Sequence, residues 1–501
     1  MNRISVLIVF SLLLAGLPVQ AQDNLTLFTP ATGHIASGDT QSWTFRAVEG
    51  SVLSLLVQAT SGDLDPQFSI ISSSGTNLIG GDDYNYPASG DALLEAITMP
   101  RTDTYTVRIS GFGTTSGDYT LTLLAGYGQV NASDDFSGAA TWKTAGDAVE
   151  IAVADEALAL ALNRPQQTGI AVYPNTNLPA IYYLQTTVTI GVNQDNWMVG
   201  LTARQGGGDY YLLLLNERGE WRFLVRDDST EKILRDWVSH PAIVAGNKTF
   251  TLGMLVNGSN FDFFYNGSLI GRQTDATIPE GGTFGLAIQT GGTLNPQMAA
   301  QFDNLFITTP LLINKHPVLP TQLLLSTPAS MAQELQRRNV IPSGGEMALN
   351  VAESFAELAK PGVERFLLGR GTTYQHLVMG TTFSWQADTA GMTGCGFIFR
   401  AVDENHYLLA YADRTGGYGL AQRVDDTFQP GIFGEKPIGS KESFHLLVVA
   451  LEDQIHYYVD GLYVGTLQLP ATEGAVGNAV VNFEPINTSC QFRDTWVWRW
   501  D

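Results

Sequence analysis

The feature that most constrains the fold is a stretch of sequence that occurs twice. The first copy, residues 261–271, is an apolar run interrupted by Asn266-Gly267, and the second, residues 455–465, is interrupted by Asp460-Gly461. Both dipeptides suit a two-residue β-hairpin turn, because its two central residues need positive φ. A proline-containing loop, a glycine and another apolar run follow each hairpin. The repeat therefore predicts two copies of one antiparallel unit.

The similarity between the two copies extends beyond the hairpins. The matched segments are residues 153–160 with 351–358, 200–204 with 396–400, 209–213 with 405–409, and 301–304 with 491–494. We interpret residues 126–310 and 311–501 as tandem duplicates. Arg204 and Arg400 end one matched segment, and for both we favour a structural role, paired with a nearby carboxylate, over a role as ligand clamps.

Length and composition set the fold class. A chain of 501 residues is too long for one hydrophobic core. Its 52 glycines, 10% aromatic residues and only 15% charged residues fit strands and turns better than helices. We expect an all-β protein of three β-sandwiches, a small one followed by two jelly rolls, with one short helix between the jelly rolls.

The net charge of −22 argues against nucleic acid or an anionic membrane as a partner. An acidic surface of this kind serves solubility or divalent cations, and we favour solubility. No cofactor is indicated apart from calcium, considered below.

Residues 1–21 have the pattern of an export signal. Arg3 precedes a mostly apolar run from residue 4 to 17, and Ala21 ends a small-residue cleavage motif. The run is shorter than the roughly 20 residues that a membrane-spanning helix needs. We expect a secreted protein, extracellular or at the cell surface, or periplasmic if the source has an outer membrane, with no membrane insertion.

Residues 22–125 predict a small sandwich, because apolar and polar residues alternate in short runs broken by turn residues. Their motifs, in chain order, are SGD at 37–39, WTF at 43–45, EG at 49–50, GDLDP at 62–66, GDD at 81–83, DTYTV at 103–107 and SGDYTL at 116–121. This order resembles the bacterial pre-peptidase C-terminal domain. The resemblance implies an accessory module that elsewhere accompanies secreted enzymes and surface proteins. No His-Glu-x-x-His motif or recognisable Ser/His/Asp set accompanies it here.

Acidic residues gather in the loops of this first module. Calcium takes six to eight oxygen ligands, several of them carboxylates, so these residues are candidate ligands. Aspartate also accepts backbone hydrogen bonds in tight turns, and turn chemistry is the favoured explanation. The five candidates are Asp63, Asp65, Asp82, Asp83 and Asp91.

The two duplicated segments share Gly-x-x-x-Arg, a polar loop, Tyr-Leu and the Asn/Asp-Gly hairpin. This order resembles the concanavalin A-like lectin and glucanase domains, including the laminin-G-like modules. The resemblance implies jelly rolls of two large antiparallel sheets, one of them concave.

A glucanase of this kind would need a nucleophile and an acid about 5–5.5 Å apart for retaining hydrolysis. The motif Glu-x-Asp-x-x-Glu is absent. The nearest candidates, Glu217, Glu220, Asp403 and Glu404, fall in predicted turns. The sequence therefore favours a non-catalytic protein.

The predicted helix lies between the duplicates. Thr327 can cap it, Pro328 suits its first turn, and Met331, Ala332 and Leu335 share one face. We expect a spacer or a buttress rather than a site.

Three tryptophans alternate on the last predicted strand and therefore share one face. Trp498 and Trp500 are candidate carbohydrate-binding residues, since exposed apolar patches often mark interaction surfaces. The favoured alternative is that Trp496 is core, matching Phe306 of the first duplicate, and that the other two cover an edge of the sandwich.

Cys395 and Cys490 are the only cysteines, both fall in the last domain, and the export signal directs the chain to an oxidising compartment. We predict a disulfide between them. The repeat places them at the positions of Val199 and Ala300, which should then be apolar neighbours in the first duplicate. Two buried free thiols are the alternative.

Together these features predict an exported, non-catalytic protein that binds carbohydrate or another extracellular polymer in adhesion or capture. One alternative is a sugar hydrolase of the concanavalin A-like class with an unrecognised site. Another is a structural envelope or stalk protein, whose concave faces would be filled by its own side chains.

Overall fold

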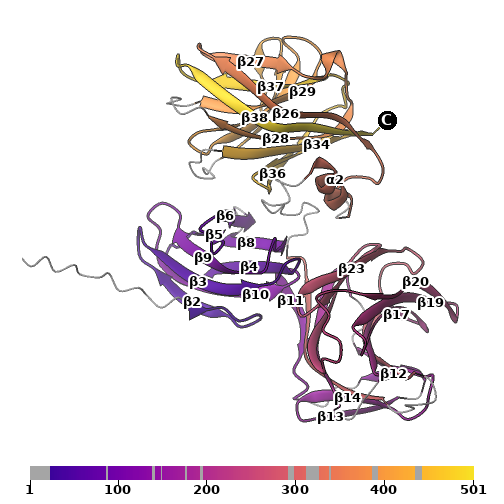
Figure 1. Cartoon of the computed structure of the whole chain (residues 1–501). Coiled ribbons are helices and arrows are strands. Elements are labelled where there is room, and N and C mark those ends of the chain that lie inside the picture. The colour runs from indigo at the N-terminus through magenta and orange to yellow at the C-terminus, as the bar shows by residue number, and fades with distance from the viewer. Residues whose placement is uncertain are drawn as a thin grey trace, which may run out of the picture.

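The computed structural model describes residues 23–85, 89–137, 142–147, 149–174, 178–191, 196–291, 298–311, 327–337, 340–385, 393–434 and 443–500. The predicted export signal lies outside these residues. Apart from helix α2 (Pro328–Arg337) and the 3-10 turn η1 (Gly369–Gly371), the regular elements described are strands. They form six sheets, packed in pairs as three sandwiches (Figure 1). The all-β prediction is confirmed, and no described helix is long and apolar enough to cross a membrane.

The first sandwich packs two five-stranded sheets, ordered β1-β3-β9-β5-β6 and β2-β10-β4-β8-β7. Alternate residues of its strands, such as Phe45, Tyr105 and Tyr119, are fully buried between the sheets. Its strands are β1 (Asp23–Asn24), β2 (Ala31–Ile35), β3 (Thr40–Ala47), β4 (Val52–Ala59), β5 (Pro66–Ile71), β6 (Asn77–Gly81), β7 (Asp83–Asn85), β8 (Ser89–Thr98), β9 (Asp103–Gly111) and β10 (Gly117–Ala125).

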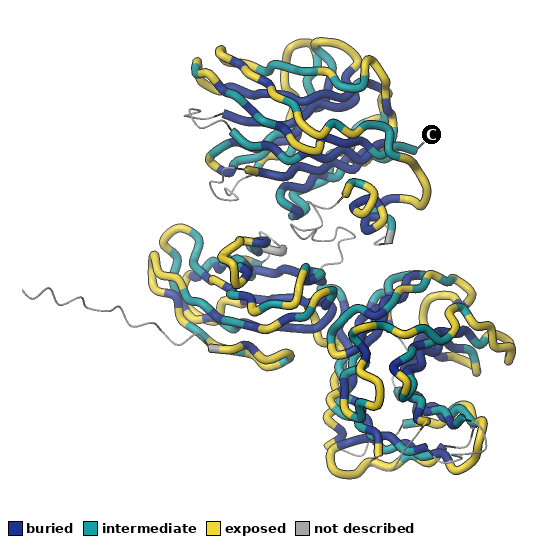
Figure 2. Tube along the Cα trace, viewed as in Figure 1, coloured by how far each residue is buried: buried dark blue, intermediate teal, exposed yellow. Residues whose placement is uncertain are grey.

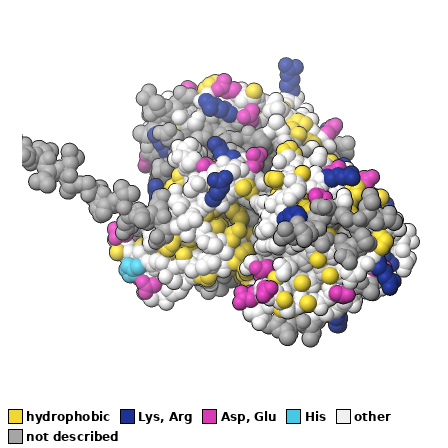
Figure 3. All heavy atoms as spheres, turned by 60° about the horizontal axis from the view of Figure 1, so that its bottom comes forward, with side chains coloured by type: hydrophobic (Ala, Val, Ile, Leu, Met, Phe, Trp, Pro, Cys, Tyr) yellow, Lys and Arg dark blue, Asp and Glu magenta, His cyan; other side chains and the backbone are white. Residues whose placement is uncertain are grey.

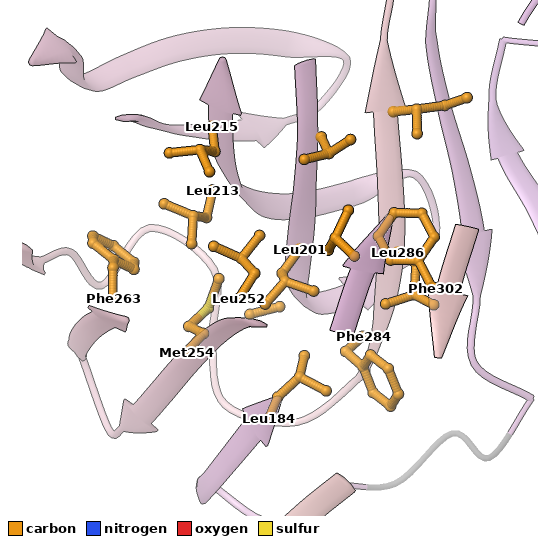
Figure 4. Packing of buried hydrophobic residues seen from close by; sticks show 14 of the residues in the cluster. Leu184, Leu201, Leu213, Leu215, Leu252, Met254, Phe263, Phe284, Leu286 and Phe302 are labelled. Carbon is orange, nitrogen blue, oxygen red and sulfur yellow. The ribbon is translucent and has the colours of Figure 1, made fainter. Parts of the chain in front are cut away.

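The second sandwich pairs an eight-stranded sheet, ordered β13-β14-β25-β16-β21-β22-β23 with β11 beside β25, with a seven-stranded sheet, ordered β12-β15-β24-β17-β18-β19-β20. Leucines and phenylalanines of both sheets meet in its core (Figure 4). Its strands are β11 (Gln129–Asp134), β12 (Lys143–Gly146), β13 (Glu150–Ala154), β14 (Ala157–Leu162), β15 (Thr168–Val172), β16 (Ile181–Ile190), β17 (Met198–Gly206), β18 (Asp209–Asn216), β19 (Glu220–Asp227), β20 (Thr230–Ser239), β21 (Thr249–Asn257), β22 (Asn260–Tyr265), β23 (Ser268–Thr274), β24 (Thr283–Gln289) and β25 (Met298–Thr309).

The third sandwich pairs a six-stranded sheet, ordered β26-β38-β28-β34-β35-β36, with a seven-stranded sheet, ordered β27-β37-β29-β30-β31-β32 with β33 beside β31. As in the other sandwiches, buried segments run through the sheets and exposed ones lie at their ends and loops (Figure 2). Its strands are β26 (Glu346–Leu358), β27 (Gly362–Leu367), β28 (His376–Trp385), β29 (Thr393–Ala401), β30 (Tyr407–Asp413), β31 (Tyr418–Val424), β32 (Thr427–Phe428), β33 (Ile432–Phe433), β34 (Ser443–Leu451), β35 (Gln454–Val459), β36 (Leu462–Gln468), β37 (Ala475–Asn482) and β38 (Thr488–Trp500).

The second and third sandwiches share the order of their central strands. Strand β17 lies between β24 and β18, and β29 lies between β37 and β30. Gly200 and Gly396 occupy the same place in these strands, because a Cβ on either would lie 2.0 Å from a carbonyl oxygen of the next strand. The hairpin residues Asn266 and Asp460 both have positive φ, 47° and 49°, as the turn chemistry predicts. The expected equivalence of residues 200–204 and 396–400 is confirmed.

Arg204 and Arg400 have the same structural role in the two copies. Both have positive φ, 52° and 48°. Arg204 donates to the carbonyl oxygen of Gly258, and Arg400 donates to that of Glu452 at 3.0 Å, so each binds the turn of the equivalent hairpin. The partners are backbone carbonyls rather than the carboxylates that we expected.

The register corrects two of the matches made from sequence. Gly200 pairs with Leu214, and Gly396 pairs with Tyr411, so counting along both strands makes Tyr407 the counterpart of Tyr210. The sequence match had placed Tyr407 opposite Tyr211, one residue away. The match of residues 153–160 to 351–358 is also displaced, because a hairpin turn separates β13 from β14 whereas β26 is continuous.

The predicted disulfide is present. Cys395 of β29 and Cys490 of β38 come from opposite sheets of the third sandwich, and their Cα atoms are 6.0 Å apart. Their counterparts Val199 and Ala300 also come from opposite sheets and are both buried in the core of the second sandwich. The bond therefore spans the two layers where the first copy has apolar packing.

Candidate ligand-binding face

Each large sandwich has two outer faces, and other parts of the chain cover one of them. In the second sandwich, Tyr183, Leu255 and Phe264 point away from its own core and are buried in the core of the first sandwich. Thr308 joins the same contact, since its hydroxyl donates to the Ala125 carbonyl at 2.8 Å and accepts from the Tyr127 amide at 2.9 Å. Figure 3 shows apolar side chains along this junction. The outer face of the eight-stranded sheet is thus a docking surface for the first sandwich.

Helix α2 covers the equivalent face of the third sandwich. Counting from the matched hairpins, Val378, Val449 and Tyr458 are the counterparts of Tyr183, Leu255 and Phe264. They are buried in one cluster with Met331, Ala332 and Leu335 of α2.

The same helix also reaches the second sandwich. The guanidinium of Arg272 lies 4.0 Å from Glu334 of α2 and 3.7 Å from Asp262 of β22. The helix is thus a buttress between the two large sandwiches, as the sequence suggested (Figure 1).

The packing of helix α2 determines how far Trp496, Trp498 and Trp500 are exposed. Trp496 is buried in the cluster that contains α2, and Trp498 and Trp500 are half-buried against it. The indole of Trp498 donates to the carbonyl of Gly344 at 3.2 Å. The three tryptophans do share one face, but the helix packs on that face. Their placement argues against Trp498 and Trp500 as a platform for sugar.

The outer face of the seven-stranded sheet of the third sandwich carries a different set of aromatic residues. Tyr407, Leu409 and Tyr411 alternate along β30 and point away from the core. A Cβ on Gly419 would lie 2.5 Å from the ring of Tyr411, and a Cβ on Gly394 would lie 3.0 Å from it. The ring can lie low across the neighbouring strands because these two positions lack side chains.

Three exposed phenylalanines surround this tyrosine pair. Phe433 pairs with Gly419 and so lies on the same face, next to Tyr411 across β31. Phe483 approaches Tyr411 with ring centroids 5.8 Å apart, and Phe428 approaches Tyr407 at 6.3 Å. Phe428, Phe433 and Phe483 are 40%, 51% and 46% exposed, whereas aromatic residues are usually highly buried. We call Tyr407, Tyr411, Phe428, Phe433 and Phe483 together the aromatic face.

Two arginines converge on Tyr407 at one end of the aromatic face. The guanidinium carbons of Arg365 and Arg423 lie 5.0 and 5.8 Å from the centroid of its ring. Arg423 also donates to the Tyr407 hydroxyl at 3.2 Å and pairs with Asp426 at 2.5 Å. Arg365 donates to the backbone carbonyl of Asp403 at 3.1 Å. The stacking holds both cations at fixed places on the face.

A histidine network borders the same end. The imidazole of His406 lies 2.9 Å from a carboxylate oxygen of Asp403 and 3.2 Å from one of Asp425. The hydrogen bond to Asp403 is the main reason that the pKa of His406 is raised, and the charge of Asp425 adds to it. The pKa of Asp403 is lowered, first by the amide of Asn405 and then by His406. The imidazole of His406 therefore lies between the carboxylates of Asp403 and Asp425.

The equivalent face of the second sandwich is built differently. Arg226 stacks on Tyr210 at 6.0 Å, as Arg423 stacks on its counterpart Tyr407, and Arg222 stacks on Trp237 at 5.9 Å. Leu214 takes the place of Tyr411 and is fully buried. The low-lying ring with exposed phenylalanines is thus a feature of the third sandwich.

The described aspartates of the calcium prediction do not come together. Asp63 accepts from the Ser116 amide at 3.0 Å, and Asp91 accepts from the Ala59 amide at 3.1 Å, which is the turn chemistry favoured above. Asp65 and Asp82 are half-buried, and the side chain of Asp83 lies outside what the structure describes. In the described part of the chain, no three of these carboxylates lie within 4.8 Å of one another.

A different acidic group has the spacing of metal ligands. Oxygens of Asp209, Asp227 and Asp228 lie within 4.8 Å of one another at the end of the second sandwich. By the register, Asp209 corresponds to His406 and Asp228 to Asp425. In the third sandwich, the imidazole of His406 therefore takes the place that the carboxylate of Asp209 has in the second.

Three of the four acids considered for hydrolysis have local structural partners. Glu217 accepts from the amide of Asn196, and Glu220 accepts from the side chain of Asn216 at 2.9 Å. Asp403 accepts from the amides of Asn405 and His406 at 2.7 and 2.9 Å. Glu217, Asp403 and Glu404 lie in turns or bends as predicted, but Glu220 is the first residue of strand β19 and is half-buried.

Sequence reasoning missed the aromatic face. The signal was present, because Tyr407, Leu409 and Tyr411 alternate with period two, and glycines occur in the segments on either side. Recognising it required knowing that Gly419 and Phe433 lie beside Tyr411, which is a matter of strand pairing.

No protein-family model and no curated protein matches the sequence. Among solved structures, the carbohydrate-binding module CBM66 from Bacillus subtilis is 15% identical, with 33% of this chain and 95% of that chain covered and a TM-score of 0.28. A β-glucanase from Bacillus licheniformis is 11% identical, with 36% and 97% covered and a TM-score of 0.28. A galectin-like protein from Bacillus subtilis is also 11% identical, with 36% and 96% covered and a TM-score of 0.28. These structural neighbours are sandwiches of the concanavalin A-like and galectin-like kind, and likenesses this weak say nothing about the ligand of this chain.

Proposed function

We propose that this protein is an exported, non-catalytic binding protein that holds a carbohydrate polymer on the aromatic face of its third sandwich. The observation that carries the proposal is the ring of Tyr411, which lies low over Gly394 and Gly419 and is flanked by the exposed rings of Phe433 and Phe483. Flat apolar rings at the surface provide the apolar contact that the faces of sugar rings can make, and exposed apolar patches mark interaction sites.

The rest of the architecture supports this choice of face. Helix α2 packs on the opposite outer face of the same sandwich, and the first sandwich packs on the corresponding face of the second. The first sandwich, resembling the pre-peptidase C-terminal domain in its motifs, acts in this proposal as an accessory module that holds the larger ones. The disulfide between Cys395 and Cys490 fits the oxidising compartment of an exported protein.

A glycan array, followed by calorimetry with the polymers that bind, tests the proposal. Phe433→Ala and Phe483→Ala should each weaken binding about tenfold, or about 1.4 kcal/mol, which is close to the value of burying an aromatic side chain. Phe355→Ala is the matched control, because Phe355 is 55% exposed but lies on β26 of the other sheet. Unchanged affinity in both face variants, or an equal loss in the control, would contradict the proposal.

A further inference from the structure

We propose that the polymer bound by the aromatic face is acidic, with a carboxylate or sulfate group that contacts Arg365. This inference rests on the proposed function and adds the chemical class of the ligand. It starts from the charges around Tyr407, on a chain that carries only 27 basic residues against 49 acidic ones.

Arg423 already has an anionic partner. Its guanidinium pairs with Asp426 at 2.5 Å and binds the hydroxyl of Tyr407. Asp403 and Asp425 are both engaged by His406. These three acids therefore contact Arg423 or His406, and none of them lies within ion-pair distance of Arg365.

Arg365 differs from these residues. Among the described residues, its polar contact is a backbone carbonyl, that of Asp403, and no carboxylate lies within 4.0 Å of its guanidinium. The side chain is half-buried, and stacking on Tyr407 at 5.0 Å fixes its plane. A planar guanidinium with unused donors is suited to bind a carboxylate or sulfate through two parallel hydrogen bonds.

The first copy shows that this cation is not needed by the fold. Arg365 pairs with Ala479 next to Gly396, and the same position beside Gly200 in the second sandwich is held by the buried Ile170. The Tyr–Arg pair is common to both copies, but the second arginine belongs to the third sandwich alone. Arg365 lies on the same face as the exposed phenylalanines, so the acidic group of a sugar stacked there would lie close to the guanidinium of Arg365.

The test measures affinity of the full mature chain by calorimetry for polygalacturonate, dextran sulfate and the neutral glucan laminarin at several salt concentrations. We expect at least one acidic polymer to bind about tenfold more tightly than laminarin, with an affinity that falls as salt rises. The two acidic polymers distinguish a carboxylate from a sulfate as the bound group. Arg365→Gln should reduce the acidic affinity about tenfold, which is the scale of a charge-assisted hydrogen bond, and should leave laminarin binding unchanged.

Two further variants make the result decisive. Arg365→Lys keeps the charge but not the planar fork, so it should retain the salt dependence with weaker binding. Arg226→Gln, at the first-copy counterpart of Arg423, is the matched control and should change nothing. Equal binding of neutral and acidic polymers that Arg365→Gln does not alter would overturn this inference and leave the proposed function standing. Binding of no polymer by the folded chain would overturn both.

Discussion

The rings of Phe28 and Phe306 lie parallel, with their centroids 3.8 Å apart and 1° between their planes. Phe28 packs against the core of the first sandwich and Phe306 lies on strand β25 of the second, so this stack joins the two sandwiches. Phe306 is also the counterpart of Trp496, which packs in the cluster of helix α2. One position of the repeat therefore anchors a different neighbour in each copy.

This stack should couple the unfolding of the first two sandwiches. We expect Phe28→Ala to lower the free energy of unfolding by about 1–2 kcal/mol, from lost apolar burial and ring stacking. Denaturant unfolding followed by tryptophan fluorescence measures the change. The exposed Phe355 provides the control, and a Phe28→Ala variant as stable as the parent chain would show that the contact does not stabilise the junction.

The disulfide should contribute most of its stability to the third sandwich. Cys395 and Cys490 are 95 residues apart in the chain, and closing a loop of that size stabilises a fold by up to about 4.7 kcal/mol on the chain-entropy model. We expect reduction, or the double variant Cys395→Ala/Cys490→Ala, to lower the melting temperature of this sandwich while the others melt as before. Thiol titration of the unfolded, unreduced protein should find no free thiol, and two free thiols would refute the bond.

His445 should make the third sandwich sensitive to acid. Burial lowers the pKa of this histidine from 6.5 to about 4. The unfolded chain therefore binds a proton that the folded chain does not, so stability falls as the pH drops from about 6.5 toward 4, by at most about 3 kcal/mol. Its counterpart in the second sandwich is Thr251. The carbonyl of Thr251 accepts from the amide of Asn266, just as the carbonyl of His445 accepts from the amide of the matched hairpin residue Asp460.

The variant His445→Thr, which introduces the residue of the first copy, provides the check. We expect its stability to vary less with pH than that of the parent chain between pH 4 and 6.5. Thermal melts across this range measure the effect. Identical pH profiles for the two proteins would assign the acid sensitivity to other groups.

The carboxylates of Asp209, Asp227 and Asp228 should repel one another when no cation is bound. Because like charges so close destabilise the fold, we expect Asp228→Asn to raise the free energy of unfolding by up to about 1 kcal/mol in low salt with chelator present. The same melts with added calcium, on this variant and on Asp63→Asn, compare the two acidic regions of the chain. A variant less stable than the parent in chelator would contradict the expected repulsion among the three carboxylates.

Local chemistry allowed the sequence to predict much of the fold. Asn266-Gly267 and Asp460-Gly461 specify hairpin turns by their need for positive φ, and period-two alternation identifies strands. The disulfide followed from the two cysteines and the order of the repeat. Contacts can be predicted from the sequence when the residues are close along the chain or are matched by a repeat.

Only the tertiary structure decided which outer faces of the sandwiches are covered. Alternation shows that Trp496, Trp498 and Trp500 share a face, but a face covered by a helix and a face open to a ligand can have the same apolar pattern. Helix α2 packs on that stripe, and the exposed rings collect around Tyr411 on the opposite sheet. The position of that ring depends on Gly394 and Gly419 in the two neighbouring strands, and such pairing is fixed by contacts between distant segments.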